Sequence, residues 1–92
     1  MNPPDDQSRP ALAPGVRLQT DKVSGEPVLV FPEGVLFINS TAQDIVARCD
    51  GQATVEQILA ALAEEYDAPA ADLREDVMAC LTELRQRKLL AL

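Results

Sequence analysis

This chain of 92 residues is most constrained by two uninterrupted apolar runs, Val28–Phe31 and Val35–Ile38, which are separated by Pro32-Glu33-Gly34. Proline presets φ at the first turn position and glycine tolerates a left-handed conformation, so the connection favours a tight hairpin. Strands that are apolar at every position are expected where both faces of a sheet are covered. The second face therefore needs a cover: the N-terminal segment, the C-terminal Leu89–Leu92, a second copy or a ligand.

A further strand is predicted before the hairpin. Val16–Asp21 alternates apolar and polar residues, which is the pattern of a strand with one solvated face. The three strands form an antiparallel meander, with Val28–Phe31 in the middle and Val35–Ile38 at an edge. Residues 1–10 hold three prolines, two aspartates and no apolar periodicity. We expect them to form a disordered tail before a folded domain at residues 11–92.

Three helices are predicted after the strands, over Thr41–Cys49, Thr54–Tyr66 and about 69–87. Asn39 or Ser40 can cap the first helix, and Thr54 can cap the second while Gln57 reaches back in a capping box. The apolar Leu89–Leu92 is expected to dock on the core, either as an extended segment or as a continuation of the last helix. The predicted fold class is α+β, winged-helix-like, with a three-stranded antiparallel sheet followed by three helices.

The formal net charge of -7 opposes binding to phosphate backbones and to anionic membranes, because nucleic-acid affinity depends on lysine and arginine. No stretch approaches the roughly 18 apolar residues of a membrane helix, and the N-terminus lacks the regions of a secretory signal. We therefore predict a cytoplasmic protein. A winged-helix DNA-binding regulator is the alternative function, because a strand-and-helix domain of this kind can carry a recognition helix. A structural dimerisation domain is a third.

Catalysis is not predicted. The sequence contains no histidine, no glycine-rich phosphate loop and no metal-ligand spacing, so we expect no catalytic residue, no metal and no cofactor. Cys49 and Cys80 fall inside predicted helices without Cys-x-x-Cys spacing, and we expect both to be reduced and buried.

The predicted edge strand is a candidate binding surface. Val35–Ile38 carries no lysine, proline or charge that would discourage pairing, so a peptide could add as a fourth strand. The same edge can pair with a second copy, or exchange strands through a hinge at Gly34, which would give a homodimer. The other interpretation is that the run is core and that a helix or loop covers its edge.

Several short segments are similar in order and spacing to one known family: Ala13–Leu18, Phe31–Gly34, Asn39–Ala42, Cys49–Gly51, Thr54–Ile58 and Leu62–Tyr66. Over about residues 11–92 the chain resembles the PqqD family of pyrroloquinoline quinone (PQQ) biosynthesis. Lys88 departs from the pattern, because related sequences often carry glycine there.

The resemblance implies a precursor-peptide recognition domain that performs no chemistry. Members of the family act as peptide chaperones: they bind the ribosomally made precursor PqqA and deliver it to PqqE, the radical SAM enzyme that joins a glutamate to a tyrosine of that peptide. The precursor lies as an added strand beside the third strand and over the last helix. The corresponding residues here are Val35, Leu36, Phe37, Ile38, Asn39, Leu73, Asp76, Val77, Cys80 and Leu84.

Overall fold

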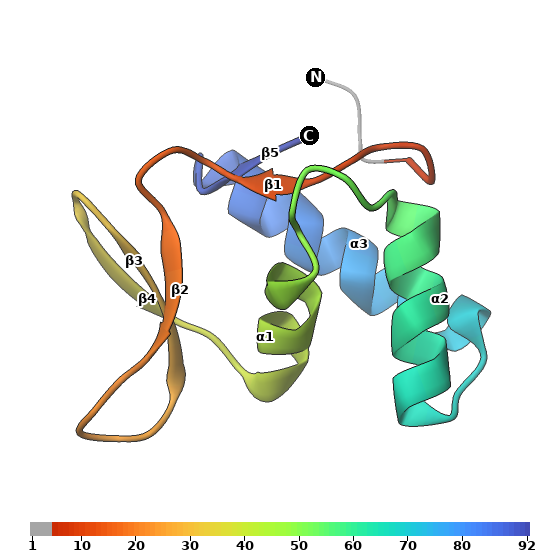
Figure 1. Ribbon diagram of the computed structural model, residues 1–92, viewed down its shortest axis with the longest axis horizontal. Helices are drawn as coiled ribbons and strands as arrows, with labels where there is room; N and C mark the ends of the chain where they lie inside the picture. Colours follow the sequence, from red (N-terminus) through yellow and green to blue (C-terminus); the bar gives the residue numbers. More distant parts are fainter. Residues whose placement is uncertain (1–4) are drawn as a thin grey trace.

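The computed structural model describes residues 5–92. Its larger sheet lies to one side of the helices (Figure 1). In chain order the elements are β1 (Ala11–Leu12), β2 (Arg17–Thr20), β3 (Pro27–Phe31), β4 (Gly34–Phe37), α1 (Ser40–Ala47), α2 (Val55–Tyr66), α3 (Ala70–Gln86) and β5 (Leu90–Ala91). The predicted α+β class, with an antiparallel meander followed by three helices, is confirmed. The comparison with winged helices stays a prediction.

The meander has the order β2-β3-β4, and its register separates two faces. Leu18, Leu29 and Leu36 lie opposite one another across the three strands and pack into the core with the helices. Alternate residues of β4 point to the other face, where Val35 and Phe37 are about half exposed. The helices therefore cover one face of the sheet and leave Val35 and Phe37 of β4 accessible on the other.

The helix starts follow from their capping residues. Asn39 caps α1, with its side-chain oxygen accepting a hydrogen bond of 2.7 Å from the amide of Ala42. Thr54 caps α2, and the predicted capping box with Gln57 is present in both directions. These bonds satisfy amides that have no partner inside a helix.

The core is aliphatic. Leu29 of β3 belongs to one buried cluster with residues of all three helices. The most deeply buried helical side chains are Ile45, Val55, Ile58, Leu62, Val77 and Leu81. At the edge of this core two polar contacts join α1 to α2: Arg48 pairs with Glu65, and the Tyr66 hydroxyl donates to Asp44. None of the helices within residues 5–92 is long and apolar enough to cross a membrane.

The two ends of the domain pair with each other. The segment Leu89–Leu92 contains the short strand β5, which pairs antiparallel with β1, so of the two predicted conformations the extended one is observed (Figure 1). Leu89 and Leu90 are buried against the core. The C-terminal segment therefore closes the end of α3 and does not cover the open face of the meander.

The predicted tail of residues 1–10 lies partly within the described residues. Residues 1–4 lie outside the described residues. From Asp5 onward the chain follows the start of α2: the amide of Val55 donates to the carbonyl of Ser8, and the amide of Glu56 donates to that of Asp6. Asp6 also pairs with Arg74 of α3. These polar partners order a segment that apolar periodicity alone could not identify.

Candidate functional site

One edge of the meander is open. Strand β4 pairs with β3, and no other strand of the described chain pairs with it. The amide of Ile38 points to β3, where it donates a hydrogen bond of 3.1 Å to the carbonyl of Pro27. Backbone groups alternate in direction along a strand, so those of Val35 and Phe37 point away from β3. They form a row of donors and acceptors that an extended peptide can satisfy.

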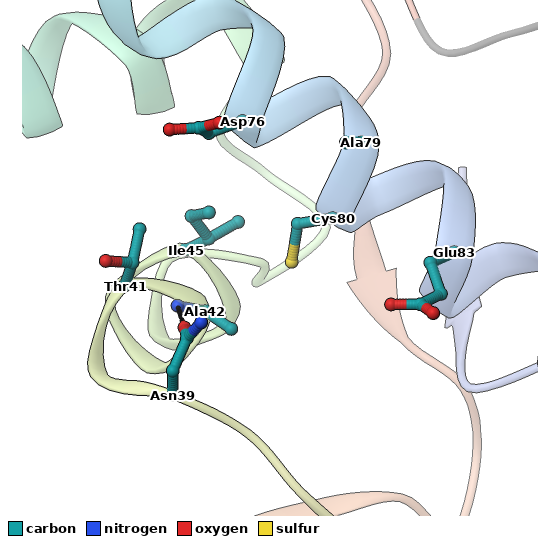
Figure 2. A pocket seen from close by; sticks show the side chains of 8 residues that line it. All are labelled: Asn39, Thr41, Ala42, Ile45, Asp76, Ala79, Cys80 and Glu83. Atoms are coloured by element: carbon teal, nitrogen blue, oxygen red, sulfur yellow. Dashed lines mark hydrogen bonds between the residues drawn. The ribbon is translucent and has the colours of Figure 1, made fainter.

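A groove lies where this edge ends. It has a volume of about 340 Å³ and runs between the start of α1 and the middle of α3 (Figure 2). Its lining consists of Asn39, Thr41, Ala42, Ile45, Asp76, Ala79, Cys80 and Glu83. Asn39 lies two residues after the end of β4 and lines the groove, so the open edge leads towards it. Together they form a continuous surface for an extended chain.

The residues predicted on α3 separate into two groups. Asp76 and Cys80 line the groove. Val77 and Leu84 are buried in the core, and Leu73 is half-buried against it. These three side chains anchor α3 on the core. Their side chains stabilise the surface without lining it.

The residues predicted on the strand also differ in role. Val35 and Phe37 are 56% and 52% exposed, and their backbone groups face the open edge. Leu36 and Ile38 pack partly against the core. Asn39 combines two roles, since it caps α1 and lines the groove.

The sequence did not indicate the α1 side of the groove, which Thr41, Ala42 and Ile45 supply. It also missed Ala79 and Glu83 on α3. The latter pair could have been found, because they share a helical stripe with Asp76 and Cys80 at spacings of three and four residues. The α1 residues depend on how two helices pack, which the local pattern does not specify.

The Cys80 thiol is hard to ionise in this setting. Burial, together with the negative charge of Glu83, raises the pKa of the Cys80 thiol to about 11. Burial also raises the pKa of Cys49 to about 12. Both thiols are free, but the prediction that both are buried is wrong for Cys80, which is half-buried because it lines the groove. Its sulfur points from α3 towards α1 (Figure 2). The groove is thus suited to binding, with a thiol that stays protonated at neutral pH.

Comparison with known proteins identifies the family. The family model described as Coenzyme PQQ synthesis protein D (PqqD) matches residues 26–90. The chain belongs to the PqqD family. The PqqA binding protein of Xanthomonas oryzae pv. oryzae is 42% identical over 85 residues, which cover 92% of each chain. The PqqA binding protein of Rhizobium meliloti is 40% identical over 79 residues, covering 86% of this chain and 81% of the relative.

Two solved PqqD structures resemble the whole domain. The solution structure of the PqqD truncation of Methylobacterium extorquens PqqCD, described as a functional, stand-alone recognition element for ribosomally synthesised and modified peptides, superposes with a TM-score of 0.85. It is 32% identical, and the match covers 97% of this chain and 95% of that one. The crystal structure of PqqD from Xanthomonas campestris is 40% identical with a TM-score of 0.62, over 96% and 98% of the chains.

Proposed function

We propose that this protein binds the PqqA precursor peptide as an added strand along β4 and presents it to the radical SAM enzyme PqqE. The names of the PqqA binding proteins at about 40% identity support the peptide as the ligand. The observation that carries the mode of binding is the open edge at Val35 and Phe37, which leads into the groove at Asn39.

Strand addition suits a carrier of precursor peptides. Main-chain hydrogen bonds supply affinity that does not depend on the peptide's side chains, and the groove between α1 and α3 supplies selectivity. Only the segment that pairs with β4 is held, so the remainder of the peptide can reach the catalytic site of another protein. In this proposal the domain has no chemistry of its own, needs no cofactor and acts in the cytoplasm.

Nucleic acid is disfavoured as the partner. Helix α2 contains no lysine or arginine. On α3, Arg74 pairs with Asp6, and Arg87 beyond its end lies 3.6 Å from Glu83. A DNA-recognition helix needs cations that are available to phosphates and base edges. These ion pairs and the net charge of -7 support the peptide ligand.

Proline at Phe37 tests the proposed strand pairing. The substitution Phe37→Pro removes an amide that points to the open edge and leaves the β3–β4 bonds in place. Loss of one such bond weakens binding of the precursor by ~1–3 kcal/mol, or roughly tenfold to a hundredfold in Kd. Glu56→Ala, on the exposed face of α2, is the control and leaves Kd unchanged. Affinities can be measured by isothermal titration calorimetry, after circular dichroism and thermal melting have shown that each variant is folded.

A complementary experiment leaves the domain intact. Single N-methyl groups are placed along the precursor, each of which removes one peptide amide donor. Pairing with β4 predicts that alternate positions lose affinity, because only every second amide of a strand faces its neighbour. Equal tolerance of all positions, together with tight binding by the Phe37→Pro variant, would exclude strand addition.

A further inference from the structure

The α3 side of the groove carries one carboxylate that has no partner among the described residues. Asp76 and Glu83 line the groove two turns apart, on either side of Ala79 and Cys80 (Figure 2). Glu83 has Arg87 at 3.6 Å. The side-chain carboxylate of Asp76 makes no hydrogen bond and no ion pair with any other residue in the range 5–92. It is therefore an acceptor available to a ligand at one end of the groove.

The surroundings of Asp76 combine negative charge with an apolar floor. Ala42, Ile45, Ala79 and Cys80 supply the apolar part, and no lysine or arginine is among the described residues that line the groove. The nearest cation on α3 towards its start, Arg74, pairs with Asp6. The net charge of -7 gives the whole chain a field of the same sign. Such a field attracts cationic segments and repels acidic ones.

We propose that the groove binds a lysine or arginine side chain of the peptide, with its charge at Asp76 and its aliphatic stem over Ile45 and Cys80. Lysine and arginine are the side chains that bury an apolar stem while keeping a charged end at a polar site. This inference rests on the proposed function, since the side chain belongs to the peptide that pairs with β4. It makes Asp76 a specificity-determining residue of the domain.

The register of an added strand also determines where the neighbouring side chains of the peptide lie. Successive side chains of a strand point to opposite faces of the sheet. A cation that enters the groove on the helix side therefore has neighbours on the open face, beside Val35 and Phe37. These two side chains are apolar and half exposed, so they favour apolar partners. The selected peptide segment is expected to contain a lysine or arginine with an apolar residue on one or both sides.

A double-mutant cycle tests the contact, with the precursor peptide as the probe. The domain is prepared as Asp76→Asn, and each lysine or arginine of the precursor is replaced singly by glutamine. We expect Asp76→Asn to weaken binding roughly three- to tenfold. One peptide substitution should cause a similar loss, and the two changes together should cost little more than either alone. Glu75→Gln is the matched control, because Glu75 is exposed on α3, carries the same charge and does not line the groove.

Charge reversal supplies a gain-of-function arm. The Asp76→Lys domain should bind the native precursor weakly and recover affinity for the precursor in which the identified cation is replaced by glutamate. If Asp76→Asn and Glu75→Gln weaken binding equally, the effect is a general field and the site is wrong. If no peptide cation matters while the unaltered domain binds the precursor, this inference alone fails. If the unaltered domain binds no precursor, the proposed function fails and this inference fails with it.

Discussion

Replacing Lys88 by glycine should stabilise the domain. Lys88 follows the end of α3 with a φ of 64°, in the left-handed region. Its amide donates to the carbonyl of Arg85 at 2.9 Å, and the amide of Leu89 donates to that of Leu84 at 3.0 Å. This pair of bonds is the Schellman ending of a helix, in which glycine usually occupies the left-handed position. Lys88 therefore stands at a position where a side chain is unfavourable.

Three opposing contributions set the size of the effect. A residue with a Cβ atom costs about 1–2 kcal/mol in the left-handed conformation. Glycine loses more backbone entropy on folding, by about 0.5–1 kcal/mol, and loss of the lysine charge near the helix end costs about 0.3 kcal/mol. The net gain for Lys88→Gly is about 0.5 kcal/mol in the free energy of unfolding, which raises Tm by roughly 2–4 °C.

Urea unfolding followed by circular dichroism measures this gain, and Lys88→Ala is the matched control. Alanine also removes the charge but keeps the left-handed strain, so Lys88→Ala should be no more stable than the parent protein. If the glycine and alanine variants have the same free energy of unfolding, strain at Lys88 does not limit stability and the account of this turn is wrong.

Three further predictions concern the C-terminal strand, the groove thiol and self-association. Leu90→Ala, which removes a buried side chain of β5, should cost about 2–4 kcal/mol of stability in urea unfolding. Cys80 should react slowly with a thiol reagent at pH 7 and faster as the pH rises towards its pKa of about 11, and bound precursor should protect it. Light scattering should show that any dimer formed through β4 dissociates when precursor binds, since both use the same edge; a ternary complex of dimer and peptide would contradict this.

The sequence identified those elements whose signals are local. The hairpin around Pro32-Glu33-Gly34 follows from turn residues between two apolar runs, and the capping box of Thr54 and Gln57 follows from two side chains three residues apart. Each signal lies within a few residues of the structure that it specifies. For this reason these predictions agree with the structure to within one or two residues.

The remaining features depend on contacts between distant segments. The extended form of Leu89–Leu92 is fixed by pairing with Ala11–Leu12, at the other end of the chain. The conformation of Asp5–Pro10 is fixed by backbone partners at the start of α2. In the groove, Asp76 was predicted, but its neighbours on α1 arise from the packing of two helices. Such pairings are not encoded in the periodicity of either segment alone.

An amide chemical-shift titration of the labelled domain with the PqqA precursor tests the central claim most directly. Each backbone amide is a separate reporter, so the bound surface can be located without any substitution. Strand addition at β4 predicts that the largest shifts occur at Val35, Phe37 and Asn39 and on the face of α3 around Asp76 and Cys80, while α2 and β2 change little. Shifts that cluster on α2 or β2, with β4 and α3 unaffected, would contradict strand addition at β4.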